Sequence, residues 1–310
     1  MKEKIFCIYH SVDFDGICSA KIVEEAHSNH EIVFFPYSYG DSSPVPSILN
    51  TAKTQSIKPI VVMVDVCLSI NEVEKLFSYF GKQNFIWIDH HKTAIEKMEK
   101  AGHSDMLGLR SIEEAACILT YKYFHSTTTD TGILTEPTIP CAIRLIGCMD
   151  IWDQTGIYFP WEEVIKPFYT GLESQFNNLK DFPALNHLNS IDFLFFTIER
   201  GKAVLKHLEL RRKAHSDKSF IFHIDGFRIL ALNTSQRGSS MLYPIFKPEI
   251  HDGVMMFSYD GSITKWTYSL YTTKEGIDLS TIASKRGGGG HAQACGFETI
   301  SLIDELKTNL

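Results

Sequence analysis

The sequence lacks several patterns that would each indicate a particular kind of protein. Its seven cysteines include no CxxC pair, which argues against a cysteine zinc site. Their odd number in mostly apolar surroundings indicates reduced, buried thiols. No apolar run approaches the roughly 20 residues of a membrane span. Lysine and arginine (30) are fewer than aspartate and glutamate (37), so the net charge is −7. This acidic balance argues against long duplex nucleic acid as a partner.

The other bulk properties are those of an ordinary globular protein, with 44% hydrophobic and 22% charged residues. A chain of 310 residues suits two domains better than a single core. The N-terminus leads directly into a strand-like segment, without a small-residue cleavage site. We therefore expect a cytoplasmic protein with no membrane partner.

The first half of the chain alternates between apolar β-rich runs and helical patterns. The strands are expected at Ile5–Tyr9, Ile32–Pro36, Ile60–Val64 and Phe85–Ile88, and the helices at Gly16–Ala26, Asn71–Phe80, Lys92–Lys100, Ser111–His125 and Thr138–Met149. Apolar strands separated by helices predict an α/β fold with a parallel sheet covered on both faces. In such sheets ligands bind beyond the carboxyl ends of the strands.

The second half changes character twice. Little strand pattern follows residue 155, and several helical runs predict a helical connector over 156–216. From residue 217 short strands predict a smaller α/β domain, with Asp225-Gly226 and Asp260-Gly261 as hairpin turns. The expected domains are thus 1–155 and 217–310, joined by the connector.

Polar side chains follow the first expected strand. His10, Asp13 and Asp15 fall in a strand-to-helix turn, where Gly16 would relieve the tight backbone. Imidazole and carboxylates together suit a borderline divalent cation such as Mn²⁺. Aspartates at a helix start are also common caps, so this motif alone leaves both interpretations open.

Two later strands end in similar residues. A single carboxylate, Asp65, follows one of them, and Asp89-His90-His91 follows the next. Adjacent histidines can supply one metal ligand and one substrate contact, while the aspartate fixes a tautomer. Further along, Asp150 and Asp153 lie at the end of an expected helix, and Asp150 is the candidate to complete a site.

A run of four glycines lies near the C-terminus, between Arg286 and His291. Consecutive glycines let backbone amides approach an anion closely, and the two flanking side chains add donors. A flexible linker is the alternative. The helical pattern before the run and the apolar strand after it favour anion recognition.

Together these motifs resemble the DHH phosphoesterases that carry a DHHA1 domain. The matching elements, in family order, are Asp-x-Asp-Gly at 13–16, Asp65, Asp89-His90-His91, Asp150 and Gly-Gly-Gly-His at 288–291. The resemblance extends from about residue 5 to 297. It implies an N-terminal parallel-sheet DHH domain, a helical connector and a smaller C-terminal DHHA1 domain. It also implies a hydrolase with two divalent metal ions, Mn²⁺ being expected and Mg²⁺ or Co²⁺ the alternatives.

The resemblance also implies residue roles. One metal would be held by His10, Asp13 and Asp65. The other would be held by Asp15, Asp65, His90 and Asp150, with Asp65 bridging the two. His91 would contact the scissile phosphate or the leaving oxygen, and Asp89 would orient the histidines. The C-terminal domain would hold the rest of the substrate in the interdomain cleft through Arg286, Gly288, Gly289 and His291.

Two features depart from the family pattern. His10 lies three residues before Asp13, whereas family members often place it two or four before, so His10 is the least secure ligand. Many members carry an arginine in a Ser-Leu-Arg-Ser stretch, where this chain has Tyr271. Arg237 is a candidate replacement for the missing arginine, and Tyr271 is a candidate for stacking on a base.

Within this family the acidic charge and short chain favour a nanoRNase-like, oligoribonuclease-type phosphodiesterase. It would hydrolyse short oligonucleotides or linear dinucleotides to mononucleotides. A polyphosphate or pyrophosphate hydrolase is the enzyme alternative, and a nucleotide-binding regulatory protein is the non-enzyme one. The sequence leaves open RNA against DNA, end polarity, and whether the chain forms a homodimer.

Overall fold

The computed structural model describes residues 4–55, 57–128, 134–235 and 245–307. The chain divides into two compact units, unit 1 (Met1–Leu205) and unit 2 (Lys206–Leu310). The boundary lies within helix α9 (Ile191–Ser216), so the expected connector is shared between the units. Among the described residues, no helix has both the length and the apolar character needed to cross a bilayer.

Unit 1 is built on four parallel strands in the order β2-β1-β3-β4. These strands are β1 (Lys4–His10), β2 (Glu31–Tyr37), β3 (Ile60–Val64) and β4 (Phe85–Ile88). The helices around and after them are α1 (Phe14–Ala26), α2 (Val45–Lys53), α3 (Ile70–Phe80), α4 (Lys92–Lys100), α5 (Ala116–His125), α6 (Cys141–Asp150), α7 (Lys166–Glu173) and α8 (Leu185–Leu188). The short elements are the turns η1 (Lys82–Asn84) and η2 (Trp161–Ile165) and the strands β5 (Thr127–Thr128) and β6 (Leu134–Thr135).

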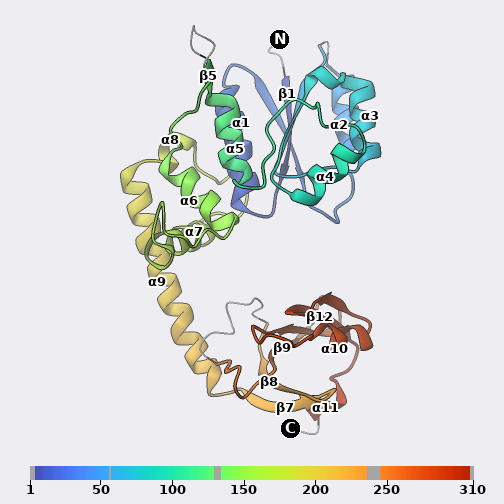
Figure 1. The fold of residues 1–310 in the computed structure, drawn as a ribbon, viewed down its shortest axis with the longest axis vertical. Coiled ribbons are helices and arrows are strands. Elements are labelled where there is room, and N and C mark those ends of the chain that lie inside the picture. The colour runs from blue at the N-terminus through green and yellow to red at the C-terminus, as the bar shows by residue number, and fades with distance from the viewer. Residues whose placement is uncertain (1–3, 56, 129–133, 236–244, 308–310) are drawn as a thin grey trace. The chain divides into compact units, whose positions relative to one another are not determined.

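Both faces of the parallel sheet are buried, as its near-continuous apolar strands predict. Along β1, Ile5 and Cys7 pack into the core formed with α1, α5 and α6, whereas Phe6 and Ile8 pack into the core formed with α2, α3 and α4. Figure 1 shows these two helical layers on opposite sides of the strands. All seven cysteines are free. Six of them are buried, as predicted, whereas Cys141 is partly exposed.

Helices α5 and α2 differ most from the sequence predictions, whereas α1 and α6 differ by two or three residues at their starts. Helix α5 begins at Ala116 and not at Ser111. Its start is delayed because the chain before it runs beside β4, where Leu107 and Arg110 form parallel bridges to Ile86 and Asp89. Helix α2 was not predicted, although a proline in its first turn is a common start signal.

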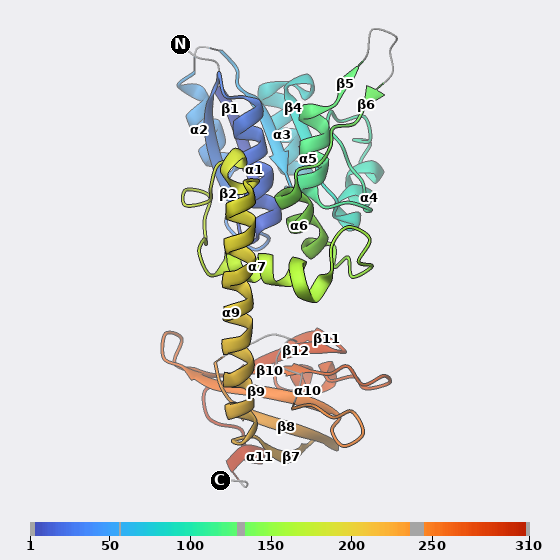
Figure 2. The ribbon, with the colours of Figure 1, turned by 90° about the vertical axis from the view of Figure 1, so that its left-hand side faces the viewer.

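Unit 2 contains a six-stranded sheet in the order β11-β12-β10-β9-β8-β7, and Figure 2 shows the strands in this succession. They are β7 (Phe220–Ile224), β8 (Phe227–Asn233), β9 (Gly253–Asp260), β10 (Lys265–Tyr271), β11 (Gly289–His291) and β12 (Ala294–Thr299). Helices α10 (Ser280–Lys285) and α11 (Asp304–Lys307) pack on one face, with Phe222, Met255 and Leu270 in the core between.

The two predicted hairpin turns have different geometries. Asp225 and Gly226 both have positive φ, 52° and 88°, as a two-residue turn of this type requires. Between β9 and β10 the connection is longer, and the positive φ falls on Thr264 (55°) and not on Gly261. The hairpin is therefore present, but its turn is not the two-residue turn that the sequence predicts.

Candidate metal centre

Three neighbouring parallel strands bring polar residues to the same edge of the unit 1 sheet. Strand β1 ends at His10, Asp65 directly follows β3, and Asp89 directly follows β4. Because the carboxyl ends of parallel strands meet at one edge, residues far apart in sequence converge there. Two helices complete the set, α1 through its first turn and α6 through its last residue, Asp150.

A first group of ligand atoms gathers around His10. Its Nδ1 lies 2.9 Å from Asp13 Oδ2 and 3.5 Å from Asp65 Oδ2. These three residues offer atoms within 4.8 Å of one another, the separation expected of ligands to one ion. The spacing of His10, three residues before Asp13, therefore does not prevent the imidazole from joining the carboxylates.

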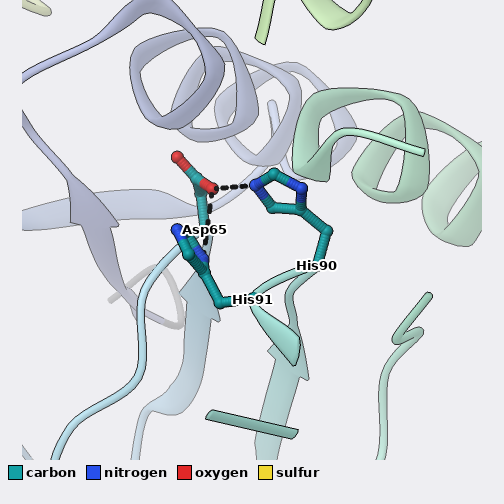
Figure 3. Close-up of side chains that lie close together, drawn as sticks. All are labelled: Asp65, His90 and His91. Atoms are coloured by element: carbon teal, nitrogen blue, oxygen red, sulfur yellow. Dashed lines mark ion pairs between the residues drawn. The ribbon is translucent and has the colours of Figure 1, made fainter. Parts of the chain in front are cut away.

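A second group gathers around His90. Its Nε2 lies 3.3 Å from Asp65 Oδ1, 3.3 Å from Asp150 Oδ2 and 3.7 Å from Asp15 Oδ2. Asp15, His90 and Asp150 form a separate triplet of candidate ligands. Asp65 contacts both histidines, one through each carboxylate oxygen. The convergence of His90 and His91 on Asp65 is visible in Figure 3.

The backbone around these ligands is constrained. Asp65 has a φ of 58°, a left-handed conformation that is uncommon for a residue other than glycine and concentrates at functional sites. At Gly16 a Cβ atom would lie 2.1 Å from the carbonyl oxygen of His10. Glycine is required there by this close approach of α1 to β1.

Asp15 is fixed by helix α5. The residue is 1% exposed, and its two carboxylate oxygens accept hydrogen bonds from the backbone N–H groups of Ala116 and Cys117, each over 2.8 Å. The residue before α5, Ala115, has no side chain that could cap the helix. Asp15 therefore caps α5 from another part of the chain. Its carboxylate also lies at the N-terminus of α5, where the positive end of the helix dipole favours a negative charge.

Asp89 organises the two histidines that follow it. Its Oδ1 accepts hydrogen bonds from the backbone N–H groups of His90 (2.8 Å) and His91 (3.2 Å), and Nδ1 of His91 donates to it over 2.7 Å. His91 Nδ1 is also 3.9 Å from Asp65, so His91 forms a third candidate triplet with Asp65 and His90. Because Nδ1–H of His91 donates to the carboxylate of Asp89, the Nε2 side of His91 is left for another partner.

The protonation of the cluster reflects its crowded carboxylates. Burial lowers the pKa of His10, but the nearby carboxylates of Asp13 and Asp65 outweigh it and raise the pKa to about 10. Burial also lowers the pKa of His90, but the carboxylates of Asp65 and Asp15 outweigh this effect and raise the pKa to about 9. Burial raises the pKa of Asp150 to about 7, with the charge of Asp15 adding to it. Burial and the charge of Asp65 also raise the pKa of Asp15.

These residues fit divalent cations. Imidazole nitrogens with carboxylate oxygens are ligands of Mn²⁺ and related ions. The two triplets contain four carboxylates, those of Asp13, Asp15, Asp65 and Asp150. Two divalent ions would balance the negative charge of these four groups. Within the described part of the chain, buried polar atoms without a hydrogen-bond partner include His10 Nδ1, Asp65 Oδ1 and Asp150 Oδ2. Such atoms are costly to bury unless a further partner, such as a metal ion, satisfies them.

Of the two aspartates at the end of α6, only Asp150 reaches this cluster. Asp153 instead accepts hydrogen bonds from the backbone N–H and the hydroxyl of Thr155, over 3.0 and 2.6 Å. The side chain of Asp153 thus stabilises its own loop.

The predicted substrate-binding residues of unit 2 lie around β11 and β12. Tyr271 and His291 are both paired with Ala294, one from each side of β12. Directly opposed residues of antiparallel strands project to the same face of a sheet, so Tyr271 and His291 lie on the same face, with Ala294 between them. Tyr271 is half-buried against Leu230 and Val254, and His291 is exposed on the edge strand. Arg237 lies outside the described residues.

The second half of the glycine run belongs to the edge strand β11. Gly289 and Gly290 pair with β12, and a Cβ at Gly288 would lie 2.1 Å from the carbonyl oxygen of Gly296. Gly290 has a φ of 130°. Close packing in a hairpin therefore accounts for part of this run, independently of any anion.

Arg286 is held by protein groups. Its guanidinium donates to Asp225 Oδ2 over 2.7 Å, to Glu305 Oε1 over 2.6 Å and to the carbonyl of Ile282 over 3.1 Å. The side chain is 16% exposed. In this arrangement Arg286 ties α10 to the β7–β8 turn and to α11, and its role as a substrate contact stays a prediction.

Sequence reasoning missed a cavity beside the centre. Its volume is about 560 Å³, and Tyr37, Tyr39, Lys97 and His91 are among its lining residues. Tyr37 is the last residue of β2, at the same sheet edge as His10. The strand-end rule that selects the metal ligands applies to Tyr37 as well, and it is the signal that could have identified this side of the cavity.

Comparison with known proteins identifies the fold. No protein-family model matches the sequence. The chain is 26% identical over 227 residues to the uncharacterised protein R106 of Acanthamoeba polyphaga mimivirus, a match that covers 69% of this chain and 47% of that protein. The pGpG-specific phosphodiesterase PggH from Vibrio cholerae superposes with a TM-score of 0.50 and 12% identity, over 99% of this chain and 96% of PggH. Exonuclease RecJ bound to manganese gives a TM-score of 0.48 and 12% identity, over 96% of this chain and 86% of RecJ.

This chain has the DHH/DHHA1 fold. At 12% identity the likeness to PggH shows the fold alone. The DHH/DHHA1 fold accounts for the arrangement predicted from the motifs, with a parallel sheet in unit 1 and a separate sheet in unit 2.

Proposed function

We propose that the protein is a metal-dependent phosphodiesterase that hydrolyses short oligonucleotides or linear dinucleotides to mononucleotides. The observation that carries this proposal is the convergence of two ligand triplets, His10-Asp13-Asp65 and Asp15-His90-Asp150, at one sheet edge. The shared fold with PggH, which acts on pGpG, is consistent with it.

The distances support the proposed ligand assignment. His10, Asp13 and Asp65 would hold one ion, and Asp15, Asp65, His90 and Asp150 the other, with Asp65 between them. Mn²⁺ is the ion expected. Two such ions, when bound, lower the pKa of a water molecule and neutralise the negative charge on the phosphate oxygens.

His91 and Asp89 would handle the proton of the leaving group. The hydrogen bond to Asp89 raises the pKa of His91 above its ordinary value, although burial opposes it. A protonated His91 can donate from Nε2 to a phosphate oxygen or to the leaving alkoxide. Asp89, 0% exposed, would hold the ring in the required orientation and tautomer.

Unit 2 would contact the rest of the substrate. The side chains proposed for this are Tyr271 and His291, with the backbone of Gly288 and Gly289 as a further donor surface. Tyr271 would stack on a base, which tolerates any sequence because every base has a flat π face. Arg286 would support this segment through its ion pairs with Asp225 and Glu305.

Product analysis tests the proposal. Purified protein with Mn²⁺ is offered 5′-phosphorylated dinucleotides, polyphosphate and pyrophosphate in parallel. We expect mononucleotides from the dinucleotides, loss of this activity in Asp150→Asn, and its retention in the neighbouring control Asp153→Asn. Orthophosphate from polyphosphate or pyrophosphate alone would replace the proposal with a phosphoanhydride hydrolase. Tight dinucleotide binding without turnover would indicate a regulatory binding protein.

A further inference from the structure

The cavity beside the metal centre has the size and position of a substrate pocket. Its volume of about 560 Å³ falls in the range of small-molecule sites, roughly 300–1,000 Å³. It lies entirely within unit 1, between the end of β2, the loop after β3 and helix α4. His91 belongs both to the cavity wall and to the candidate metal centre. A ligand group in the cavity would therefore be continuous with a phosphate at the metals.

Aromatic rings run from the centre into the cavity. The ring centroids of His91 and Tyr39 are 6.0 Å apart, and those of Tyr39 and Tyr37 are 6.3 Å apart. The hydroxyl of Tyr39 accepts the backbone N–H of Cys67 over 3.1 Å, which fixes the ring. Such a row offers faces and edges against which a flat heteroaromatic group can pack.

The other lining groups favour a ligand that is largely apolar and carries little charge. Leu68, Ile70 and Met98 supply aliphatic surface. Glu72 is occupied, because it caps α3 by accepting from the backbone N–H and the hydroxyl of Ser69. Lys97 is exposed at the wall and has no ion pair within the described part of the chain. One cation beside aromatic and aliphatic walls does not suit a polyphosphate chain, which carries a charge at every phosphate.

We propose that this cavity binds the nucleoside next to the scissile phosphate, with its base packed against Tyr37 and Tyr39 and its sugar-phosphate edge facing Lys97. The proposal deepens the proposed function and rests on it, because it places the base of a nucleotide substrate within unit 1. It also makes the enzyme selective for nucleotides over inorganic phosphate chains.

Ligand binding to the full-length protein with Mn²⁺ tests the pocket, measured by isothermal titration calorimetry without turnover. The probes are guanosine and uridine 5′-monophosphate, with ribose 5-phosphate as the probe that lacks a base. We expect the nucleotides to bind about tenfold more tightly than ribose 5-phosphate, the size of effect that base–aromatic stacking supplies. Filling the cavity from α4 by Ala94→Phe should remove this preference and leave ribose 5-phosphate binding unchanged.

Two further comparisons distinguish loss of the pocket from misfolding and from a general effect of charge. Thr93→Phe, at an exposed position of the same wall, should also reduce the preference, and both variants should keep the thermal midpoint of the wild type. Lys97→Met should weaken nucleotide binding about two- to fivefold, whereas Lys100→Met, on the same helix outside the cavity, should not. Equal weakening by both lysine variants would overturn the assignment of Lys97.

The outcomes separate the pocket from the proposed function. Equal affinity for nucleotides and ribose 5-phosphate, while dinucleotides are still cleaved, would overturn the pocket and leave the function standing. A tenfold preference that survives both Ala94→Phe and Thr93→Phe would also overturn it. A preference lost in both variants, in a protein that cleaves no dinucleotide, would support the pocket and reject the phosphodiesterase.

Discussion

The carboxylate of Asp15 accepts a hydrogen bond from the backbone N–H of Cys117 over 2.8 Å, although 102 residues separate them. Asp15 thus serves two purposes, as a candidate metal ligand and as the cap of helix α5. The same carboxylate also accepts the N–H of Ala116. The geometry of the metal centre is therefore coupled to the stability of α5.

Replacing Asp15 should destabilise the protein even without metal. In Asp15→Ala two buried N–H groups lose their acceptor, so we expect the free energy of unfolding to fall by about 2 kcal/mol. Asp150→Ala is the matched control, because it removes a proposed ligand that caps no helix. Its metal-free stability should stay within about 0.5 kcal/mol of the wild type. Chemical denaturation in the presence of a chelator measures both, and equal losses would contradict the capping role.

Asp89 should set the protonation of His91. The pKa of His91 is raised chiefly by its hydrogen bond to Asp89, so Asp89→Asn should lower it toward the ordinary histidine value. NMR titration of the histidine ring signals in chelated protein measures this pKa. We also expect kcat/KM on dinucleotides to fall about 100-fold, a typical size for a general acid or base. A pKa of His91 that is unchanged in Asp89→Asn would show that Asp89 does not act on His91.

Stabilisation by Mn²⁺ should increase with pH. In the metal-free fold the pKa values of His10 (about 10), His90 (about 9) and Asp150 (about 7) all lie above their ordinary values. The folded site then binds more protons than the unfolded chain, so metal-free stability falls as pH rises through these values.

Metal binding displaces these protons. Deprotonated ligands bind metal ions more tightly, so the affinity for Mn²⁺ rises with pH. The increase in thermal midpoint caused by Mn²⁺ should therefore be larger at pH 8.5 than at pH 6. Differential scanning fluorimetry across this window, with chelator as the reference, measures the difference. An increase that is constant or largest at pH 6 would argue against these residues as the ligands.

Arg286 and His291 should respond differently to truncation. Arg286→Ala leaves Asp225 and Glu305 without their guanidinium partner, so we expect a loss of about 1–3 kcal/mol in the free energy of unfolding. His291→Ala, at an exposed edge position, should leave stability unchanged and raise KM for dinucleotides. Thermal unfolding and steady-state kinetics of the two variants decide the matter. A raised KM in a fully stable Arg286→Ala would restore the role that the sequence predicts for it.

Much of this arrangement could be predicted from the sequence because its causes are local. An apolar run such as Ile60–Val64 predicts a buried strand of a parallel sheet. A carboxylate directly after such a strand lies at the edge of the sheet where the strands end. The convergence of His10, Asp65 and His90 follows from parallel pairing alone. The hairpin turn at Asp225-Gly226 is equally local.

What could not be predicted depends on contacts between distant segments. The start of α5 depends on a cap supplied by Asp15. The partners of Arg286 come from Asp225 and Glu305, which are 61 and 19 residues away. An arginine beside a glycine run predicts an anion-binding site. In the structure the guanidinium of Arg286 is instead paired with carboxylates of the same unit. Tyr39 belongs to the cavity wall only because the end of β2 lies near α4.

The central claim is that the strand-end cluster holds two divalent ions, and counting bound Mn²⁺ tests it most directly. Elemental analysis of dialysed protein, with electron paramagnetic resonance to detect spin coupling between neighbouring ions, gives both number and proximity. The account predicts two coupled Mn²⁺ ions per chain in the wild type, and one uncoupled ion in His10→Ala and in Asp150→Ala. One ion or none in the wild type, or two uncoupled ions, would contradict it.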